Sequence, residues 1–93
     1  MGKTVYILYS KTVDKYYTGS TNNLTRRLEE HNSGHTKSTK SGIPWKLVYQ
    51  LHFEDDSSAI KFENHIKKMK SRTFIEKLIS AEHIARPDQS GRS

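Results

Sequence analysis

The chain has 93 residues, no cysteine and a formal net charge of +6, with a sequence pI of about 9.7. The lack of cysteine excludes a disulfide framework, a cysteine-ligated zinc site and a thiol nucleophile, and no apolar run approaches the roughly 20 residues that cross a bilayer. We therefore expect a cytoplasmic protein with one thin core and no membrane partner, whose positive charge favours a polyanion such as nucleic acid.

Two strands are predicted near the N-terminus. Residues 4–10, TVYILYS, are mostly β-branched or aromatic and contain no breaker, which is typical of a strand covered on both faces and therefore central in its sheet. Residues 15–20, KYYTGS, follow a short turn and predict an antiparallel partner that ends at Gly19. Because adjacent strand residues point to opposite faces, we expect Tyr16 and Tyr17 to have different surroundings.

A helical period replaces the strand pattern after Asn22. In LTRRLEEHN, residues 24–32, the two leucines share one face, and Arg27 and His31 lie one turn apart beside it. Polar residues before this segment offer helix caps, so a helix of about ten to twelve residues is predicted, ending at Asn-Ser-Gly. A lone helix histidine such as His31 is often only a structural hydrogen-bonding residue.

The second half of the chain predicts a loop and a third strand. Residues 33–44 are polar, basic and rich in Gly and Ser, with no periodicity. Residues 45–53, WKLVYQLHF, alternate apolar and polar side chains and predict a strand. The apolar face of this strand consists of Trp45, Leu47, Tyr49, Leu51 and Phe53.

Two further helices and a tail complete the predicted organisation. Residues 54–72 begin with acids and end with lysines, in agreement with the helix dipole, and residues 73–80 predict a short third helix. We expect a single α+β domain over residues 1–80, with a three-stranded antiparallel sheet whose first strand is central, and a disordered tail over 81–93. The inward stripe of the longer helix consists of Ala59, Phe62, Ile66 and Met69.

Glu63 lies at the edge of that stripe, about 80° from its centre. An acid in this position loses part of its hydration and needs a cation. Two interpretations stay open: a boundary glutamate that pairs with Lys67 one helical turn later, or a metal ligand.

Basic side chains gather in the loop of residues 33–44 and toward the end of the longer helix. A solvated lysine-rich face is the ordinary explanation of such runs. The other explanation is contact with a phosphate backbone, which positions a nucleic acid without reading its bases. The candidate nucleic-acid-binding residues are Arg26, Lys37, Lys40, Lys67, Lys68, Lys70 and Arg72.

The motifs, taken in order, resemble those of the GIY-YIG nuclease family. TVY at residues 4–6 is followed after ten residues by YTG at 17–19, then by RRLEEHN at 26–32 and by Glu63 on a later helix. In this sequence TVY replaces the GIY triplet of the family's name and YTG replaces the YIG triplet, and each triplet keeps its tyrosine. The resemblance covers about residues 4–80 and is strongest to small single-domain members related to the nuclease domain of the excision-repair subunit that incises DNA.

The resemblance implies a GIY-YIG-like fold and Mg²⁺-dependent hydrolysis of DNA, with Mn²⁺ as a substitute ion. One glutamate can suffice for Mg²⁺, because this ion keeps several waters and takes a phosphate oxygen from its substrate. Gly19 corresponds to the glycine at which the chain turns tightly into the first helix. The implied catalytic residues are Tyr6, Tyr17, Arg27, His31 and Glu63, of which Glu63 is the metal ligand.

The general base is left open between Tyr6 and His31. A tyrosine with a pKa near 10 needs neighbouring cations to lower it, whereas the reference pKa of histidine is near 6.5. The late asparagine of larger family members has no counterpart, since no asparagine follows Asn64.

The resemblance also implies a role in DNA repair on branched or single-stranded DNA, with low sequence specificity or with specificity supplied by a protein partner. Two alternatives to a nuclease remain. One is a nucleic-acid-binding module of the same fold without significant turnover. The other is an interaction domain whose lysines only keep it in solution.

Overall fold

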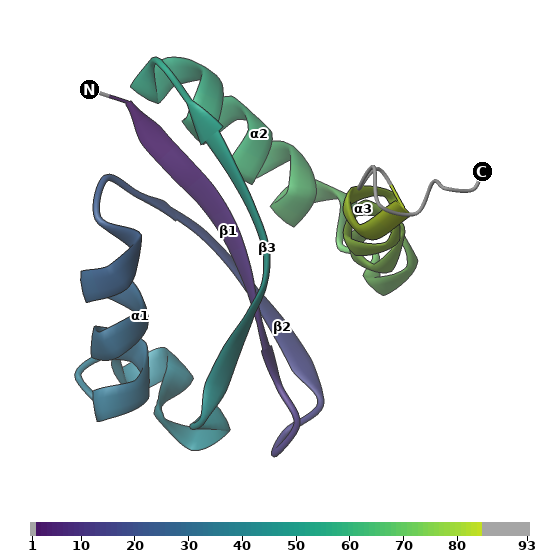
Figure 1. The fold of residues 1–93 in the computed structure, drawn as a ribbon. Coiled ribbons are helices and arrows are strands. Elements are labelled where there is room, and N and C mark those ends of the chain that lie inside the picture. Colours follow the sequence, from purple (N-terminus) through teal and green to yellow (C-terminus); the bar gives the residue numbers. More distant parts are fainter. Residues whose placement is uncertain (1, 85–93) are drawn as a thin grey trace.

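The computed structural model describes residues 2–84, and for residues 82–84 only the backbone. It confirms the predicted fold class, because the three strands form one antiparallel sheet in the order β2-β1-β3 with β1 in the centre. Figure 1 shows α1 on one side of the sheet and α2 and α3 on the other. The elements are β1 (Lys3–Ser10), β2 (Lys15–Thr21), α1 (Leu24–Ser33), the 3₁₀ helix η1 (Lys37–Gly42), β3 (Trp45–Phe53), α2 (Asp56–Met69) and α3 (Arg72–Ile84).

The central strand is covered on both faces, as its composition predicts. Val5 and Ile7 belong to the core beneath α2 and α3, whereas Tyr6 and Leu8 belong to the core beneath α1. All four side chains are buried. The sheet therefore divides the protein into two thin cores, with β1 at the centre of each, so the expectation of a single core is wrong.

The two adjacent tyrosines of β2 separate as expected. Tyr16 packs into the core beneath α2 and α3, and the Arg72 guanidinium lies 5.2 Å from its ring centroid. Tyr17 packs on the opposite face, in the core that contains Tyr6 and Trp45. The sequence alternation thus assigns only Tyr17 to the side of the sheet that carries α1.

Local capping explains where α1 begins and ends and where α2 begins. The Asn23 side chain accepts the backbone N–H of Arg26 at the start of α1, and Gly34 ends that helix in the left-handed region with φ of 85°. Asp55 caps α2 in the same manner, accepting the backbone N–H of Ser58. No helix among residues 2–84 is long and apolar enough to span a membrane.

Four expectations about the second half of the chain need correction. The single apolar face predicted for β3 is wrong, because a register shift pairs Ile7 with Tyr49 and Leu8 with Leu47 and skips the residue between them. Trp45 and Leu47 therefore face α1, whereas Tyr49 and Phe53 pack beneath α2 and α3.

Met69 does not belong to the buried stripe of α2. Its exposed fraction is 46%, because the helix ends at this residue and Lys70 adopts a left-handed conformation with φ of 48°. The loop of residues 33–44 includes η1, which its composition did not predict. The third helix continues to Ile84, beyond the boundary expected at residue 80, and the remaining part of the expected tail, 85–93, lies outside the described residues.

Candidate active site

Tyr6 lies in the middle of β1, directly opposite Gly19 of β2. Its ring covers the Gly19 backbone so closely that a Cβ at that position would lie 2.6 Å from the tyrosine Oη. The glycine is therefore needed for the approach of an aromatic ring. The expectation of a tight turn at this residue is wrong, since Gly19 lies within β2, which continues to Thr21.

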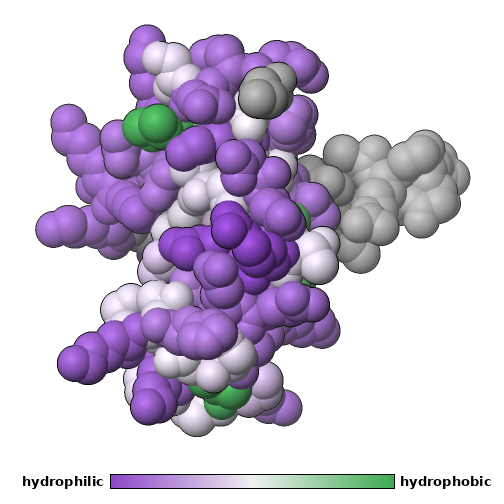
Figure 2. Space-filling view, turned by 90° about the vertical axis from the view of Figure 1, so that its left-hand side faces the viewer, coloured by the Kyte–Doolittle hydropathy of each residue, from purple (hydrophilic) through white to green (hydrophobic). Residues whose placement is uncertain are grey.

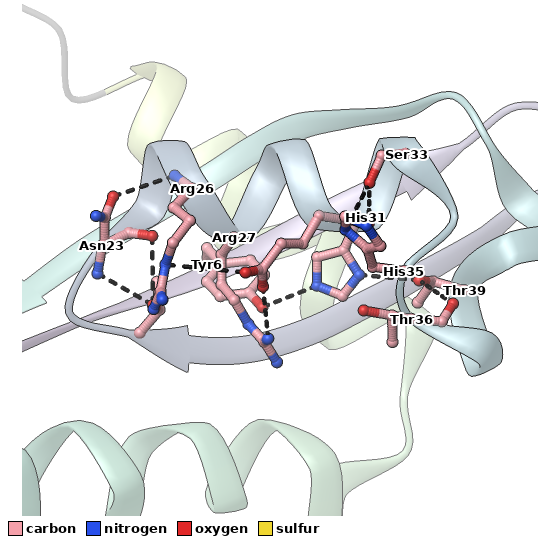
Figure 3. Close-up of polar contacts among 11 residues, drawn as sticks. Tyr6, Asn23, Arg26, Arg27, His31, Ser33, His35, Thr36 and Thr39 are labelled. Atoms are coloured by element: carbon pink, nitrogen blue, oxygen red, sulfur yellow. Dashed lines mark hydrogen bonds and ion pairs between the residues drawn. The ribbon is translucent and has the colours of Figure 1, made fainter.

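His31, in the last turn of α1, forms hydrogen bonds through both ring nitrogens. Its Nε2 lies 3.1 Å from the Tyr6 hydroxyl and its Nδ1 lies 2.9 Å from Thr39 Oγ1 (Figure 3). Thr39 donates its own proton to the Thr36 carbonyl, at 3.3 Å, so its oxygen accepts from Nδ1–H. This leaves Nε2 unprotonated, and it accepts the Tyr6 hydroxyl proton.

The site sets the protonation of this pair at neutral pH. Burial lowers the pKa of His31, and the charge of Arg27 lowers it further. Burial also raises the pKa of Tyr6, as does the nearby Tyr17, while Arg27 acts in the opposite direction. Tyr6 is therefore a neutral donor and His31 a neutral acceptor, and both shifts hold the shared proton on the tyrosine oxygen in the resting site.

Arg27 and Tyr17 form the outer layer of the cluster. Tyr6 and His31 are 1% and 0% exposed, whereas the Arg27 side chain is 37% exposed. Its Nη1 lies 3.0 Å from Glu30 Oε1, and hydrogen bonding to Glu30 and then to Tyr6 raises its pKa. The Tyr17 ring centroid lies 4.8 Å from that of His31 and 6.4 Å from that of Tyr6.

Glu63 belongs to α2, which lies on the other side of the sheet from α1 (Figure 1). The Ser20 hydroxyl of β2 donates to Glu63 Oε1 at 2.5 Å, and Lys67 Nζ lies 2.7 Å from Oε2. Ser20 follows Gly19, the partner of Tyr6 in the sheet. Among residues 2–84, no hydrogen bond or ion pair joins Glu63 directly to Tyr6, Tyr17, Arg27 or His31. The glutamate thus borders the cluster without touching it.

The Glu63 carboxylate is ionised at neutral pH and suited to a cation. Burial alone would raise its pKa, but the hydrogen bonds from Lys67 and Ser20 outweigh that effect and lower it. No group of three or more His, Cys, Asp or Glu side chains in the described part of the chain could hold a metal ion. One charged carboxylate fits an ion such as Mg²⁺, which keeps its waters and binds a substrate phosphate.

The candidate nucleic-acid-binding residues do not form one patch. Lys37 and Lys40 lie exposed on η1, and Lys68 and Lys70 lie exposed at the end of α2. Figure 2 shows the α1 side of the molecule as mostly hydrophilic, with small separate hydrophobic spots.

Three of these candidates are engaged within the protein. Lys67 pairs with Glu63, and Arg26 lies 3.9 Å from Glu30. Arg72 bridges Asp14, at 2.7 Å, and Glu76, at 3.1 Å. Its guanidinium therefore links the β1–β2 turn to α3 and has its donors largely occupied.

The sequence did not single out Thr39, Ser20 or Asn32, and all three support the site. The Asn32 amide donates to the Trp45 carbonyl at 3.0 Å and accepts the Trp45 N–H at 2.5 Å. The Trp45 indole N–H donates to the Thr39 carbonyl at 2.7 Å, which positions η1 against His31. Asn32 follows His31 in the motif and could have been noticed, whereas Thr39 and Ser20 carry no sequence signal.

Comparisons with known proteins find chains that are similar to this one over most of its length. The family model described as the GIY-YIG catalytic domain matches residues 2–77. A UPF0213 protein of Clostridium perfringens is 42% identical over 81 residues, covering 86% of this chain and 85% of that protein. A UPF0213 protein of Natronomonas pharaonis is 38% identical over 79 residues, covering 84% and 91%. The solution NMR structure of a UPF0213 protein from Bacillus halodurans aligns with a TM-score of 0.60 and 32% identity, over 100% of this chain and 98% of that one.

Proposed function

Because the chain belongs to the GIY-YIG family, we propose that it is a Mg²⁺-dependent endonuclease that hydrolyses phosphodiester bonds in DNA. The observation that carries this proposal is the hydrogen bond of 3.1 Å from Tyr6 to an unprotonated His31 Nε2. A buried tyrosine backed by a neutral imidazole is a group prepared to pass a proton. The nearby Arg27 supplies the fixed positive charge that a phosphate requires.

The proposed proton transfer joins the two candidate bases into one unit. The attacking water gives a proton to Tyr6 Oη as the Tyr6 proton passes to His31 Nε2, and Thr39 keeps the imidazole in the tautomer that accepts it. His31 itself is fully buried, so it acts through Tyr6. Water reaches the tyrosine oxygen once Arg27 has turned away toward the phosphate.

The exposed groups bind and orient the substrate. Arg27 exchanges its contact with Glu30 for a non-bridging phosphate oxygen, which its planar guanidinium can hold in a bidentate manner. The Tyr17 hydroxyl orients the water or the phosphate. Glu63 is the residue that would hold Mg²⁺, whose chemistry is Lewis-acid stabilisation of the phosphate and the leaving oxygen.

The proposed substrate is branched or single-stranded DNA, cut with low sequence specificity during DNA repair in the cytoplasm. The net charge of +6 supports binding to a polyanion. Phosphate contacts position a nucleic acid without specifying its sequence. A protein partner is therefore the proposed source of any specificity.

Cleavage assays with defined DNA substrates test this proposal. Flapped, branched and single-stranded DNA are each incubated with Mg²⁺ and one of three proteins: the wild type, Glu63→Gln or Glu29→Gln. The last variant is the matched control, because Glu29 is an exposed glutamate on α1. We expect cleavage by the wild type and by Glu29→Gln and its loss in Glu63→Gln. Equal cleavage by all three proteins would indicate a contaminating nuclease and refute the proposal.

A second candidate function is a nucleic-acid-binding module without significant turnover. The closed state of the site favours it, because Tyr6 and His31 are buried and both oxygens of Glu63 have protein partners. Binding to DNA that weakens with salt, together with no cleavage of any substrate under Mg²⁺ or Mn²⁺, would establish this function over the first.

A further inference from the structure

The carboxylate proposed to bind Mg²⁺ already holds a cation from its own helix. Lys67 Nζ lies 2.7 Å from Glu63 Oε2, while Ser20 occupies Oε1. The Lys67 side chain is 50% exposed and that of Glu63 is 15% exposed. The ammonium group therefore stands between a largely buried carboxylate and the solvent.

The same lysine lines a hollow of about 350 Å³ between β2 and the junction of α2 with α3. Tyr17 and Lys70 also line this hollow. Lys67 thus contacts the proposed metal ligand and also borders an open space on the α2 side of β2, the face opposite to the one on which the Tyr17 ring packs. A flexible four-carbon stem allows an ammonium group to move between two such positions.

We propose that Lys67 is the resident cation of the Glu63 carboxylate, which a divalent ion displaces, and that its ammonium then contacts a substrate phosphate in the hollow between β2 and the junction of α2 with α3. This inference rests on the proposed function, because it assumes that Glu63 binds the ion. A divalent ion on this carboxylate repels the Lys67 ammonium, which lies 2.7 Å from Oε2, so metal and lysine compete there. A half-exposed ion pair within one helix is weak enough to yield to a divalent ion.

An ordinary helix salt bridge is the alternative, and Lys68 provides the control that separates the two. Lys68 is the next residue of α2, is exposed and carries the same charge. Lys67→Met and Lys68→Met therefore change the net charge equally, but only the first removes the competing ammonium. A third variant, Lys67→Arg, keeps a cation at the carboxylate.

The experiment measures Mn²⁺ affinity without DNA, on the full chain, from the free Mn²⁺ signal in electron paramagnetic resonance. We expect Lys67→Met to bind Mn²⁺ about tenfold more tightly than the wild type. Lys68→Met should stay within about twofold, and Lys67→Arg should resemble the wild type. An equal gain in Lys67→Met and Lys68→Met, or no gain in either, would overturn the displacement.

Glu63→Gln separates failure of this inference from failure of the proposed function. Loss of Mn²⁺ binding in Glu63→Gln, with no gain in Lys67→Met, would overturn the role of Lys67 alone. Mn²⁺ binding that is unchanged in Glu63→Gln, or absent from every variant, would overturn both proposals.

The contact with the phosphate has its own measurement. Ca²⁺ is used to occupy the metal site without supporting turnover. Under this condition, the affinity for single-stranded DNA is measured as a function of salt concentration. The slope of log affinity against log salt should be smaller for Lys67→Met than for the wild type by about 0.7, the value for one phosphate contact. An unchanged slope would overturn the second half of the proposal. Thermal unfolding of each variant verifies that it is folded.

Discussion

The Tyr6 hydroxyl donates a hydrogen bond to His31 Nε2 across 3.1 Å, although the two residues are 25 positions apart in the sequence. Both side chains are buried, one supplied by the central strand and the other by the last turn of α1. Considered separately, either residue is a candidate general base. In the proposed mechanism this hydrogen bond joins them into one proton-transfer unit, in which each depends on the other.

A double-mutant cycle tests this unit. We expect Tyr6→Phe to lower the cleavage rate by about 10²- to 10⁴-fold, the usual contribution of a positioned acid or base. His31→Gln should cause a similar loss, and the double variant should be hardly slower than either single one. Losses that multiply in the double variant would mean that the two residues act independently.

Tyr17→Phe and Tyr16→Phe form a matched pair on opposite faces of β2. Tyr17→Phe should lower the cleavage rate because the ring packs against Tyr6 and His31 and the proposed role of its hydroxyl is to orient the water or the phosphate. Tyr16→Phe should leave the rate unchanged and lower the free energy of unfolding by at most about 1 kcal/mol, since Tyr16 packs beneath α2 and α3. A slower Tyr16→Phe enzyme would contradict this assignment.

Gly19→Ala should destabilise the protein and disturb the site together. The added Cβ would lie 2.6 Å from Tyr6 Oη and 2.8 Å from its Cζ, so the ring must move. We expect a loss of about 1 to 3 kcal/mol in the free energy of unfolding, as for other overpacked positions. Urea titration followed by circular dichroism measures it, and unchanged stability would show that the ring does not rest on this glycine.

Thr39→Val removes the acceptor of the His31 Nδ1 proton while keeping the side-chain shape. A buried N–H without a partner costs about 1 to 3 kcal/mol, and the imidazole is no longer held in the tautomer that accepts the Tyr6 proton. Both the free energy of unfolding and the cleavage rate should therefore fall. Ser38→Ala, in the same 3₁₀ helix but exposed, should change neither.

The stability of the protein should depend on pH through His31. Its pKa in the folded state lies below the reference value of 6.5, because burial and then Arg27 disfavour its charged form. Between the two pKa values the unfolded chain binds more protons, so the free energy of unfolding falls as pH is lowered from about 7 and levels off below the folded pKa.

The His31→Gln variant identifies the residue responsible for this pH dependence. Chemical unfolding of the wild type and the variant is compared between about pH 5 and pH 7, above the range in which most carboxylates titrate. The fall in stability should be absent from His31→Gln. An equal fall in both proteins would assign the effect to another group.

Salt-dependent DNA binding should distinguish two residues of the candidate nucleic-acid-binding set. Arg72 is committed to Asp14 and Glu76, whereas Lys70 is exposed and lines the hollow between β2 and the junction of α2 with α3. Lys70→Ala should reduce the slope of affinity against salt by about 0.7 to 0.9, the value for one phosphate contact. Arg72→Ala should leave this slope unchanged. A reduced slope in Arg72→Ala would show that Arg72 does contact the DNA.

Much of the fold could be predicted because strands and helix ends depend on short stretches of chain. The unbroken run of residues 4–10 indicated a central strand, and the alternation after Lys15 separated Tyr16 from Tyr17. The apolar alternation of β3 predicted a single apolar face, which is wrong because a register shift at Val48 turns the residues before and after it to opposite faces of the sheet. Such a shift depends on pairing with β1.

The sequence by itself determined which residues had the chemistry for a site, because the spacing of Tyr6, Tyr17, Arg27, His31 and Glu63 can be read along the chain. Only the tertiary structure decided how they are connected. Thr39 orients His31 from the 3₁₀ helix η1, and Ser20 of β2 donates a hydrogen bond to Glu63 of α2, which lies 43 positions further along the chain. Local periodicity carries no information about such contacts, because they arise only when packing brings distant segments together.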